Sequence, residues 1–571
     1  MSGGISRVAS TLCVKSSLLR RYRNVTEMSL SLAMGQGSLA ETEADDAFSP
    51  VRGVVTCLEP HPSANVRRQL RERCLALAGH RGSEEQVSFS CAPYRVCPLG
   101  AHIDHQGGTV AGFALNMGIC IAYIPSPEDD RGEIKLAATR DGEGEGEPST
   151  FEMHVTDDPE PTDDWTAFVR GVVHVVRGWA SEKGARCDAG FTGVISGCPG
   201  GLEGGGISSS AALTVALIHA FRDVNNLASL IRREDVVRLA QRVEHEWRGV
   251  RCGILDQGCV VMSKPGALTV LDCARYQRRF ARADDRTATA SSRGDTAGAT
   301  SGSGSDGDGD EETFSPWNPL RWFGGDWTPS RTGPSRIDPN VDESGREVVK
   351  DFWDDGPDAG SDLPFAVILV FSGVRKPLTR TGYNDRVDEC QRAARLLLDA
   401  SGRGVPRDGT PPTLHMVTRE EWTAAMRATE TTSGPETLPE NLARRARHFF
   451  EENRRAVNGV RAWRDGDIAS FGALVNASGA SSVENYECGC EQITALWKIA
   501  KDAAGVFGAR FSGAGFRGCV VALCEPGRAA MDAAELIAGE YARLYPELAA
   551  DAPVIVTRPG RGAFILRNED E

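Results

Sequence analysis

The chain has 571 residues, enough for two or more compact lobes that each bury a core. Its composition, 40% hydrophobic and 25% charged, is ordinary for a globular protein, and no apolar run could span a bilayer. The net charge of −15 argues against non-specific binding to nucleic acid or to anionic membranes. The 16 scattered cysteines indicate reduced thiols. We therefore expect a cytoplasmic protein without a nucleic-acid or membrane partner.

The first residues differ in composition from the rest of the chain. Residues 1–26 contain five basic residues and no acidic one. This composition is typical of an organelle transit peptide, and the alternatives are a disordered extension or a start at Met28 or Met34. We expect residues 1–50 to form a disordered extension, and its role in targeting stays open.

Helices and strands are predicted from the spacing of apolar residues. Four helices are expected in the first half of the chain, over 66–78, 163–180, 208–221 and 234–247. Residues 87–124 are expected to form strands and loops. The expected helices and strands together predict an ordered lobe that contains both.

The composition changes abruptly near Ala283. From there to Glu312 the chain offers almost nothing apolar to bury, so we expect an insertion that is at least partly disordered. Buried strands are predicted beyond it, at 365–371 and 518–523. The expected domains are an N-terminal lobe, the insertion and a C-terminal lobe, over 51–276, 277–362 and 363–571.

A glycine-rich segment precedes the third predicted helix. Gly204–Gly206 would let the backbone approach a ligand closely, and Ser208–Ser210 would open the helix. Free N–H groups and the positive dipole end make such a helix start an anion site. A turn capped by serine is the alternative. The segment lacks the lysine of a Walker A loop, so a phosphate held here would need another cation.

Three further segments carry polar residues among glycines or next to helices. Residues 93–108 combine Arg, His and Asp with Gly and Pro, which suggests a rigid turn that presents polar groups to a sugar. Glu244 adjoins the apolar face of its helix, and Asp256 is expected in the loop that follows. An acid in this position could take a proton from a substrate hydroxyl. Residues 510–519 could form a second phosphate loop or a tight turn before a strand.

Together these segments resemble the GHMP kinases, whose three motifs occur here in the family order over about 85–275 and 363–566. Residues 94–108 are similar to the signature of galactokinases in that family. The resemblance implies a two-lobed α+β kinase. Its N-terminal lobe would be like the second domain of ribosomal protein S5, and its C-terminal lobe would be ferredoxin-like.

The resemblance also implies roles for individual residues and two small partners, ATP and Mg²⁺. Asp256 would be the catalytic base and Arg95 the stabilising cation, while Ser210 and Glu244 would hold Mg²⁺. The residues implied to contact the sugar are Ala101, His102, Asp104, Gly253 and Tyr383. The residues implied to bind the nucleotide are Trp165, Phe168, Gly204, Gly205, Gly206, Ile207, Ser208, Ser209, Ser210, Gly513, Ala514 and Gly515.

One position departs from the galactokinase pattern. Galactokinases carry a glutamate where this chain has Ala101, and that glutamate faces the C6 hydroxyl of the sugar. A substrate carboxylate ~4 Å from it would be repelled by about 4 kcal/mol at an effective dielectric of ~20. With alanine the segment resembles galacturonokinase, and the expected substrate is D-galacturonate. The cation for its carboxylate would come from Arg375, Lys376 or Arg380.

Two other functions remain open at this stage. The first is a galactokinase that acts on galactose or a related sugar. The second is a non-catalytic sugar sensor built on a galactokinase body, against which Arg95, Asp256, Ser210 and Glu244 argue. The oligomeric state is not predicted.

Overall fold

The computed structural model describes residues 54–58, 61–79, 82–139, 149–157, 162, 164–197, 205–265, 267–274, 365–374, 381–407, 409–431 and 438–567. The chain divides into two units, Met1–Pro50 and Val51–Glu571, and the described residues belong to the second. The expected extension (1–50) and insertion (277–362) lie outside these ranges. Among the described helices, none combines the length and the apolar character needed to cross a bilayer.

The first sheet has seven strands, in the order β12-β2-β3-β6-β4-β5 with β7 beside β3. Its strands are β2 (Ser88–Leu99), β3 (Thr109–Pro125), β4 (Glu133–Thr139), β5 (Ser149–His154), β6 (Phe191–Ser196), β7 (Thr269–Asp272) and β12 (Phe564–Leu566). The long antiparallel pair β2–β3 is buried along almost its whole length, because helices cover both faces. Its register shifts twice, once on each side of the pairs formed by Arg95 and Val96.

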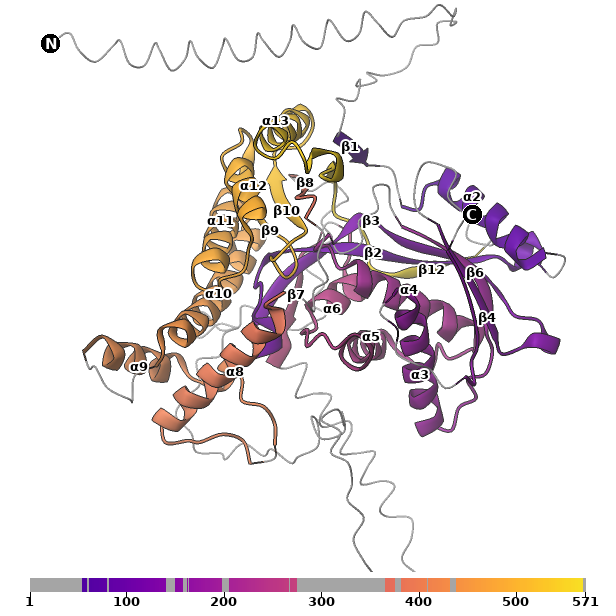
Figure 1. The fold of residues 1–571 in the computed structure, drawn as a ribbon, viewed down its shortest axis with the longest axis horizontal. Helices are drawn as coiled ribbons and strands as arrows, with labels where there is room; N and C mark the ends of the chain where they lie inside the picture. Colours follow the sequence, from indigo (N-terminus) through magenta and orange to yellow (C-terminus); the bar gives the residue numbers. More distant parts are fainter. Residues whose placement is uncertain are drawn as a thin grey trace, which may run out of the picture. The chain divides into compact units, whose positions relative to one another are not determined.

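Five helices accompany this sheet in the first half of the chain. They are α2 (Ala64–Ala78), α3 (Thr166–Glu182), α4 (Ser209–Val224), α5 (Arg233–Arg248) and α6 (Leu255–Met262). In Figure 1, α3, α4, α5 and α6 lie together on one side of the sheet and α2 lies on the other. The four predicted helices are confirmed within a few residues. Helix α4 is apolar nearly all round because it is enclosed by β2, β3, α3 and α5.

The second sheet has five strands, in the order β1-β11-β8-β10-β9. Its strands are β1 (Val54–Cys57), β8 (Ala366–Phe371), β9 (Val506–Phe511), β10 (Cys519–Cys524) and β11 (Val554–Thr557). The C-terminal helices are α8 (Tyr383–Ala400), α9 (Arg419–Thr431), α10 (Glu440–Arg464), α11 (Ile468–Glu484), α12 (Glu491–Lys501) and α13 (Arg528–Leu544). Helices α11, α12 and α13 pack on this sheet, and Figure 1 shows them next to β9 and β10. Short 3₁₀ turns are η2 (Glu84–Gln86), η3 (Asp104–Gln106), η4 (Glu128–Asp130), η7 (Leu414–Met416) and η8 (Ala549–Asp551).

The first and last strands of the described chain each pair in the sheet of the opposite half. Strand β1 pairs in parallel with β11 in the second sheet, although it precedes every strand of the first. Strand β12 pairs with β2 in the first sheet, although it ends the C-terminal half. The expected division into 51–276 and 363–571 therefore does not follow the sheets at either end.

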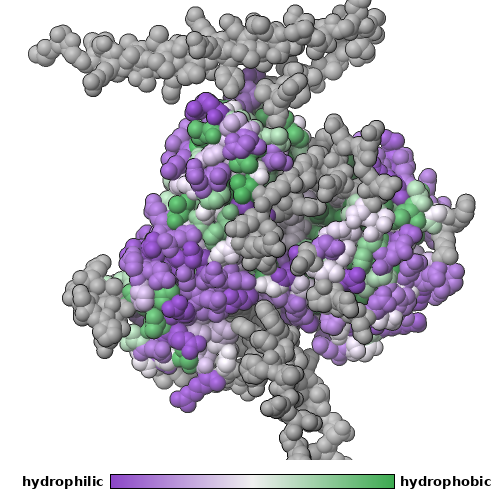
Figure 2. Space-filling model, viewed as in Figure 1, coloured by the Kyte–Doolittle hydropathy of each residue, from purple (hydrophilic) through white to green (hydrophobic). Residues whose placement is uncertain are grey.

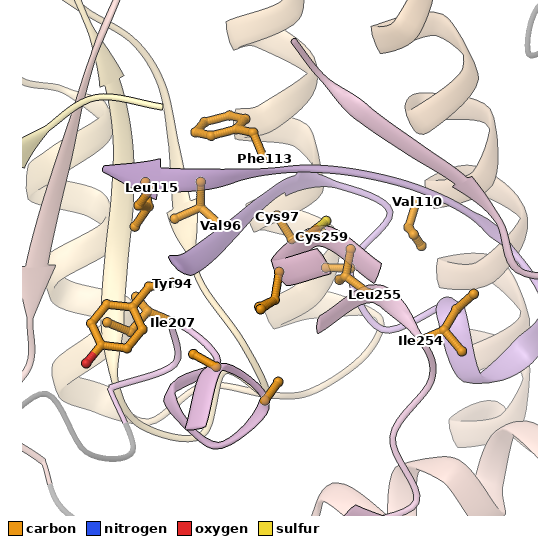
Figure 3. Close-up of a cluster of buried hydrophobic side chains, with 14 of the residues drawn as sticks. Tyr94, Val96, Cys97, Val110, Phe113, Leu115, Ile207, Ile254, Leu255 and Cys259 are labelled. Carbon is orange, nitrogen blue, oxygen red and sulfur yellow. The ribbon is translucent and has the colours of Figure 1, made fainter. Parts of the chain in front are cut away.

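A cluster of buried side chains supports the ends of these elements (Figure 3). Val96 and Cys97 come from β2, Phe113 from β3, and Leu255 and Cys259 from α6. All five are 6% exposed or less. Because such interiors are close-packed, they hold the polar residues on the same elements in fixed positions.

The surface agrees with the ordinary composition of the chain. Figure 2 shows hydrophilic residues over most of the described surface on this face. The large apolar side chains exposed within the described ranges are Val55, Leu58, Leu396, Leu536 and Leu544.

Candidate active site

A cavity lies where the two halves of the described chain meet. One group of lining residues comes from the first sheet and its helices: Arg95, Cys97, Ala101, His102, Asp104, Gly206, Ser208, Ser209, Ser210, Glu244, Val250, Cys252, Leu255 and Asp256. The other group comes from the C-terminal half: Tyr383, Arg510, Gly513, Ala514 and Arg517. The cavity therefore brings together the four polar segments singled out in the sequence.

An ion pair between Arg95 and Asp256 lies at the centre of this site. Arg95 Nη2 and Nε donate to Asp256 Oδ1 over 2.6 and 2.9 Å. Arg95 also donates to the carbonyl of Gly206 at 3.1 Å and to Ser512 Oγ at 3.3 Å. One guanidinium thus connects β2, the loop before α4, the start of α6 and the loop after β9.

Two sequence expectations about this pair need correction. Arg95 lies within strand β2, not in a turn, because the strand continues to Leu99 between buried neighbours. Asp256 lies in the first turn of α6, not in a loop. A carboxylate in a first helical turn is favoured by the helix dipole. The turn predicted within 93–108 is confined to the residues that follow β2.

The electrostatics of the pair keep both groups oriented. Burial disfavours the charged form of Arg95, but the carboxylate of Asp256 outweighs this and raises the arginine pKa. Arg95 is 3% exposed, whereas Asp256 is 29% exposed. Asp256 Oδ2 accepts no hydrogen bond from the described residues. One carboxylate oxygen is therefore fixed, and the other is available to a ligand.

The serine segment begins helix α4. Ser208 is the N-cap residue and has a left-handed backbone with φ 61°. Its side chain makes no capping bond, contrary to the ordinary role of serine at this position. Its buried Oγ has no hydrogen-bond partner among the described residues. The Ser208 hydroxyl therefore lies at the cavity, next to a helix start of the kind that binds anions.

Two glycine loops touch each other through their backbones. A Cβ atom on Gly206 would lie 2.6 Å from the carbonyl oxygen of Ser512, and one on Gly513 would lie 2.8 Å from Gly206 Cα. Gly518 packs in the same way on Gly205, where its Cβ would lie 2.6 Å from the carbonyl oxygen. Gly206, Gly513 and Gly518 all have a positive φ, of 79°, 68° and 97°. Only glycine allows this contact.

Two buried acids lie beside Asp256. Burial raises the pKa of Glu244 to about 7, with a smaller contribution from the charge of Asp256, while a hydrogen bond with Ser210 opposes the shift. Burial, followed by the charge of Asp256, raises the pKa of Asp104 to about 6. The site therefore concentrates negative charge that a bound cation or hydroxyl donors would relieve.

The turn after β2 forms another part of the cavity. His102 has a left-handed backbone, with φ 62°, and its ring stacks on Tyr486 with centroids 4.4 Å apart. Its Nε2 lies 3.3 Å from Cys488 Sγ, and the carbonyl of Ala101 lies 3.0 Å from His448 Nε2. The methyl group of Ala101 is thereby held at the cavity wall.

Gly253 does not line the cavity, but its lack of a side chain makes room for Asp104, which does. A Cβ atom at this position would lie 2.3 Å from Asp104 Cγ. Asp104 Oδ2 also accepts from the backbone N–H of Leu255 at 3.3 Å. The glycine therefore lets the Asp104 carboxylate sit against the start of α6.

Several predicted site residues do not line this cavity. Trp165 packs edge-to-face on Phe151 at 6.0 Å, and the guanidinium of Arg248 lies 5.1 Å from the ring centre of Phe168. Gly205, Ile207, Gly253 and Gly515 are also absent from the lining. Gly204, Arg375, Lys376 and Arg380 lie outside the described residues. Within the described ranges, no group of three or more His, Cys, Asp or Glu could hold a metal ion.

Other lining residues were missed by sequence reasoning. Arg510 and Arg517 fall in the segment 510–519, which was interpreted as a second phosphate loop or a tight turn, with no role given to its side chains. Cys97, Cys252 and Val250 also line the cavity. Two arginines beside a glycine loop were the available signal, but a sequence does not say which way a side chain points.

Comparisons with known proteins give the class to which this fold and site belong. The N-terminal domain model of the GHMP kinases matches residues 168–264, and the C-terminal domain model matches residues 457–542. The galacturonokinase of Arabidopsis thaliana is 32% identical over 88% of this chain and 99% of its own length. The chain therefore belongs to the GHMP kinase family, as the sequence motifs predicted.

Galactokinases are further relatives. The enzyme of Homo sapiens is 26% identical over 86% of this chain and 96% of its own length. The crystal structure of Lactococcus lactis galactokinase complexed with galactose has a TM-score of 0.60 and 21% identity, and covers 87% of this chain and 99% of that one. This structural match confirms the expected two-lobed α+β fold.

Proposed function

We propose that this protein is an ATP-dependent sugar 1-kinase that converts D-galacturonate to galacturonate 1-phosphate. The observation that carries the proposal is the Arg95–Asp256 pair, which joins the loop before α4 to the loop after β9. The similarity to a galacturonokinase over nearly its whole length supports the substrate. ATP is the co-substrate expected for a member of a kinase family.

The reaction follows from the geometry of the pair. The anomeric oxygen forms a bond to the γ-phosphorus of ATP, and the bond from that phosphorus to the β–γ bridging oxygen breaks. The proton of the anomeric hydroxyl passes to Asp256, whose Oδ2 is not bonded within the described residues. Arg95 holds the other carboxylate oxygen and stabilises the negative charge that develops at the reacting centre.

The phosphates of ATP bind at the start of α4. The first N–H groups of this helix and the unbonded hydroxyl of Ser208 offer donors to them. Arg517 lines the cavity from the loop after β9. It supplies the cation that the loop before α4 lacks, since that loop has no Walker A lysine.

Glu244 and Ser210 fit a magnesium ion. Mg²⁺ prefers carboxylate and hydroxyl oxygens and usually also binds substrate phosphates. The carboxylate of Glu244 is buried, hydrogen-bonded to Ser210, and shifted toward its neutral form. A cation here would restore the charged form, and bound Mg²⁺ would neutralise charge on the transferring phosphate.

The substrate assignment is tested with a panel of sugars. The purified full-length protein is assayed for ADP release with galacturonate and with galactose, with and without EDTA. We expect a higher kcat/KM for galacturonate and loss of turnover in EDTA. A preference for galactose would make the protein a galactokinase, and sugar binding without ADP release would make it a sensor.

Ala101→Glu is the matched test of the cavity wall. A carboxylate here would repel that of galacturonate by about 4 kcal/mol, equivalent to roughly a thousandfold in affinity. We expect kcat/KM for galacturonate to fall toward this limit while galactose is retained or gains. Ala101→Ser, which adds a hydroxyl without charge, serves as the control. An unchanged preference in Ala101→Glu would contradict the proposed orientation of the sugar.

A further inference from the structure

Two buried side chains of α10 bind the backbone of the turn that follows β2. Glu452 Oε1 accepts from the N–H of Gly100 at 2.8 Å, and His448 Nε2 lies 3.0 Å from the carbonyl oxygen of Ala101. His448 and Glu452 are four residues apart in α10, so they lie on the same face of the helix. They are 1% and 0% exposed. The start of the turn is therefore held by side chains from the C-terminal half of the chain.

The same helix also fixes the two strands that the turn connects. Gly459 is about three turns from His448, and a Cβ atom on it would overlap Cδ1 of Leu99, the last residue of β2. Asn453 Oδ1 accepts from the N–H of Thr109, the first residue of β3, at 2.7 Å. Helix α10 therefore holds both ends of the connection between β2 and β3.

The hydrogen bonds of His448 have a defined direction. A carbonyl oxygen only accepts, so Nε2 of His448 carries the proton that it donates to Ala101. Its Nδ1 then accepts from Ser481 Oγ at 3.0 Å, and Ser481 accepts from Asn485 Nδ2 at 3.2 Å. Burial lowers the pKa of His448 to about 4, so the ring is neutral near pH 7. Groups at the end of α11 thus orient the ring that holds Ala101.

Glu452 supplies a charged acceptor at a buried position. Burial by itself would raise its pKa, but neighbouring charges, with Arg455 foremost, hold the pKa below its ordinary value. Its Oε2 accepts from Arg455 Nε at 2.7 Å, and its Oε1 also accepts from Ser478 Oγ at 2.5 Å. Hydrogen bonds to an ionised acceptor are stronger than neutral ones. The N–H of Gly100 is therefore bound firmly.

The turn needs this support and carries part of the cavity wall. Gly100 and His102 have positive φ, of 87° and 62°, and the second is an uncommon conformation for a residue with a side chain. Ala101, His102 and Asp104 all line the cavity. A displacement of the turn would therefore move three lining residues together.

Resting on the proposed function, we propose that His448 and Glu452 are positioning residues for the sugar. Neither belongs to the lining of the cavity, and both act through the backbone of residues 100–101. They hold the turn where the sugar binds with its anomeric hydroxyl at Asp256. The start of α4, where ATP binds in the proposed function, takes no part in these hydrogen bonds. Their loss should therefore weaken binding of the sugar and spare binding of ATP.

The test replaces His448 by phenylalanine, which keeps a ring but donates no hydrogen bond to Ala101. The full-length wild type and His448→Phe are assayed with galacturonate and ATP varied in turn. We expect kcat/KM for galacturonate to fall by about 10- to 100-fold, mostly through KM, while KM for ATP changes by less than about twofold. Glu452→Gln, which removes the charge from the acceptor, should act in the same direction by about threefold or more.

Two further variants separate positioning from general stability. His448→Gln should restore most of the sugar affinity, because its amide N–H can donate from the position of Nε2. Phe450→Leu is the matched control on the same helix. Phe450 stacks on Trp422 of α9, with ring centroids 4.7 Å apart. Its truncation should lower the melting temperature and leave both KM values unchanged.

Thermal unfolding shows whether each variant is folded. If His448→Phe does not fold, His448→Asn takes its place. Asparagine reaches only the position of Nδ1, so it can keep the contact with Ser481 but loses Ala101. KM for galacturonate should then rise in His448→Asn and stay near the wild-type value in His448→Gln.

The outcomes separate this inference from the proposed function. A wild type that prefers galactose overturns the proposed substrate, and the same variants then give the comparison with galactose. A wild type that binds sugar without turnover overturns the kinase activity, and sugar affinity by calorimetry replaces KM. Folded His448 and Glu452 variants with an unchanged KM for the sugar overturn the positioning role. So do variants in which KM for the sugar and KM for ATP rise equally.

Discussion

At the scale of single residues, Asp256 has a structural role beside the proposed role of catalytic base. It neutralises Arg95, which is 3% exposed, and it presents a second oxygen to the cavity. Removing the charge of Asp256 therefore affects both stability and rate. The two effects can be separated because they appear in different measurements.

Asp256→Asn should lower kcat by about 10²- to 10⁴-fold, the usual value of a positioned general base. It should also lower the free energy of unfolding by about 1–3 kcal/mol, because Arg95 keeps a neutral acceptor but loses its counter-charge. Steady-state kinetics and urea unfolding measure the two effects. Asp388→Asn, which breaks the exposed pair with Arg251, is the control and should change neither by much. A variant with full kcat would exclude Asp256 as the base.

Asp104 gives the folded protein a defined dependence on pH. Burial raises its pKa in the folded state to about 6, from an ordinary value of 3.8. The folded state therefore holds its proton more tightly than the unfolded state does. The resulting stabilisation is complete below pH 4 and is lost as the pH rises through 6.

Asp104→Asn should thus gain stability relative to the wild type as the pH is raised from 5 to 8 without ligand. Thermal unfolding of both proteins across this range measures the difference. Galacturonate should reduce this difference in stability at pH 8, because substrate hydroxyls donate to the Asp104 carboxylate of the wild type. A difference in melting temperature that does not vary with pH would show that Asp104 does not titrate in this range.

At the scale of elements, the site depends on backbone contact between two loops. The loop before α4 and the loop after β9 touch at Gly206 and Gly513, with no side chain between them. This contact aligns the start of α4 with the C-terminal half of the chain. A small displacement at this point should move the phosphate-binding donors.

Gly513→Ala should raise KM for ATP and lower kcat/KM by about 10- to 100-fold, because the new methyl would lie 2.8 Å from Gly206 Cα. Gly527→Ala is the matched control. Gly527 also has a positive φ, of 74°, but a Cβ there would meet nothing within 4 Å. Both substitutions strain a backbone of positive φ, but only Gly513→Ala adds a clash. Equal kinetics in the two variants would refute the importance of the loop contact.

At the scale of the whole molecule, the C-terminal segment fastens the helix that carries Asp256. The N–H of Gly562 donates to the carbonyl of Ser263 at 2.7 Å, and that of Ala563 donates to Val260 at 2.8 Å. Strand β12 then pairs with β2, which carries Arg95. The elements that carry Arg95 and Asp256 are therefore both supported by residues 562–566.

Deletion from Gly560 onward should destabilise the protein by about 4 kcal/mol or more, from the lost hydrogen bonds and burial. It should also lower kcat, because α6 loses its backbone support. Deletion of residues 568–571 alone, which lie beyond β12, is the control and should change little. Calorimetry and kinetics test both. A truncated protein with normal stability and rate would show that the crossed chain end has no such role.

The spacing of apolar residues predicted most of the helices, but it placed Arg95 and Asp256 in the wrong kind of element. Helix α4 was predicted from its apolar residues, and the glycines and serines before it marked a loop that lines the cavity. Arg95 was assigned to a turn because β2 is buried on both sides and shows no alternation of polar and apolar residues. Asp256 was assigned to a loop because α6 has only eight residues, too few for a helical period to stand out.

The sequence by itself determined the family, the motif residues Arg95 and Asp256, and the alanine at position 101, because these depend on residue identity and order. Only the tertiary structure decided which side chains line the cavity. It placed Arg510 and Arg517 in the lining and left Trp165 and Phe168 out of it. The physical reason is that side-chain direction and charge compensation depend on contacts between residues hundreds of positions apart, such as Arg510 with the turn at Gly100.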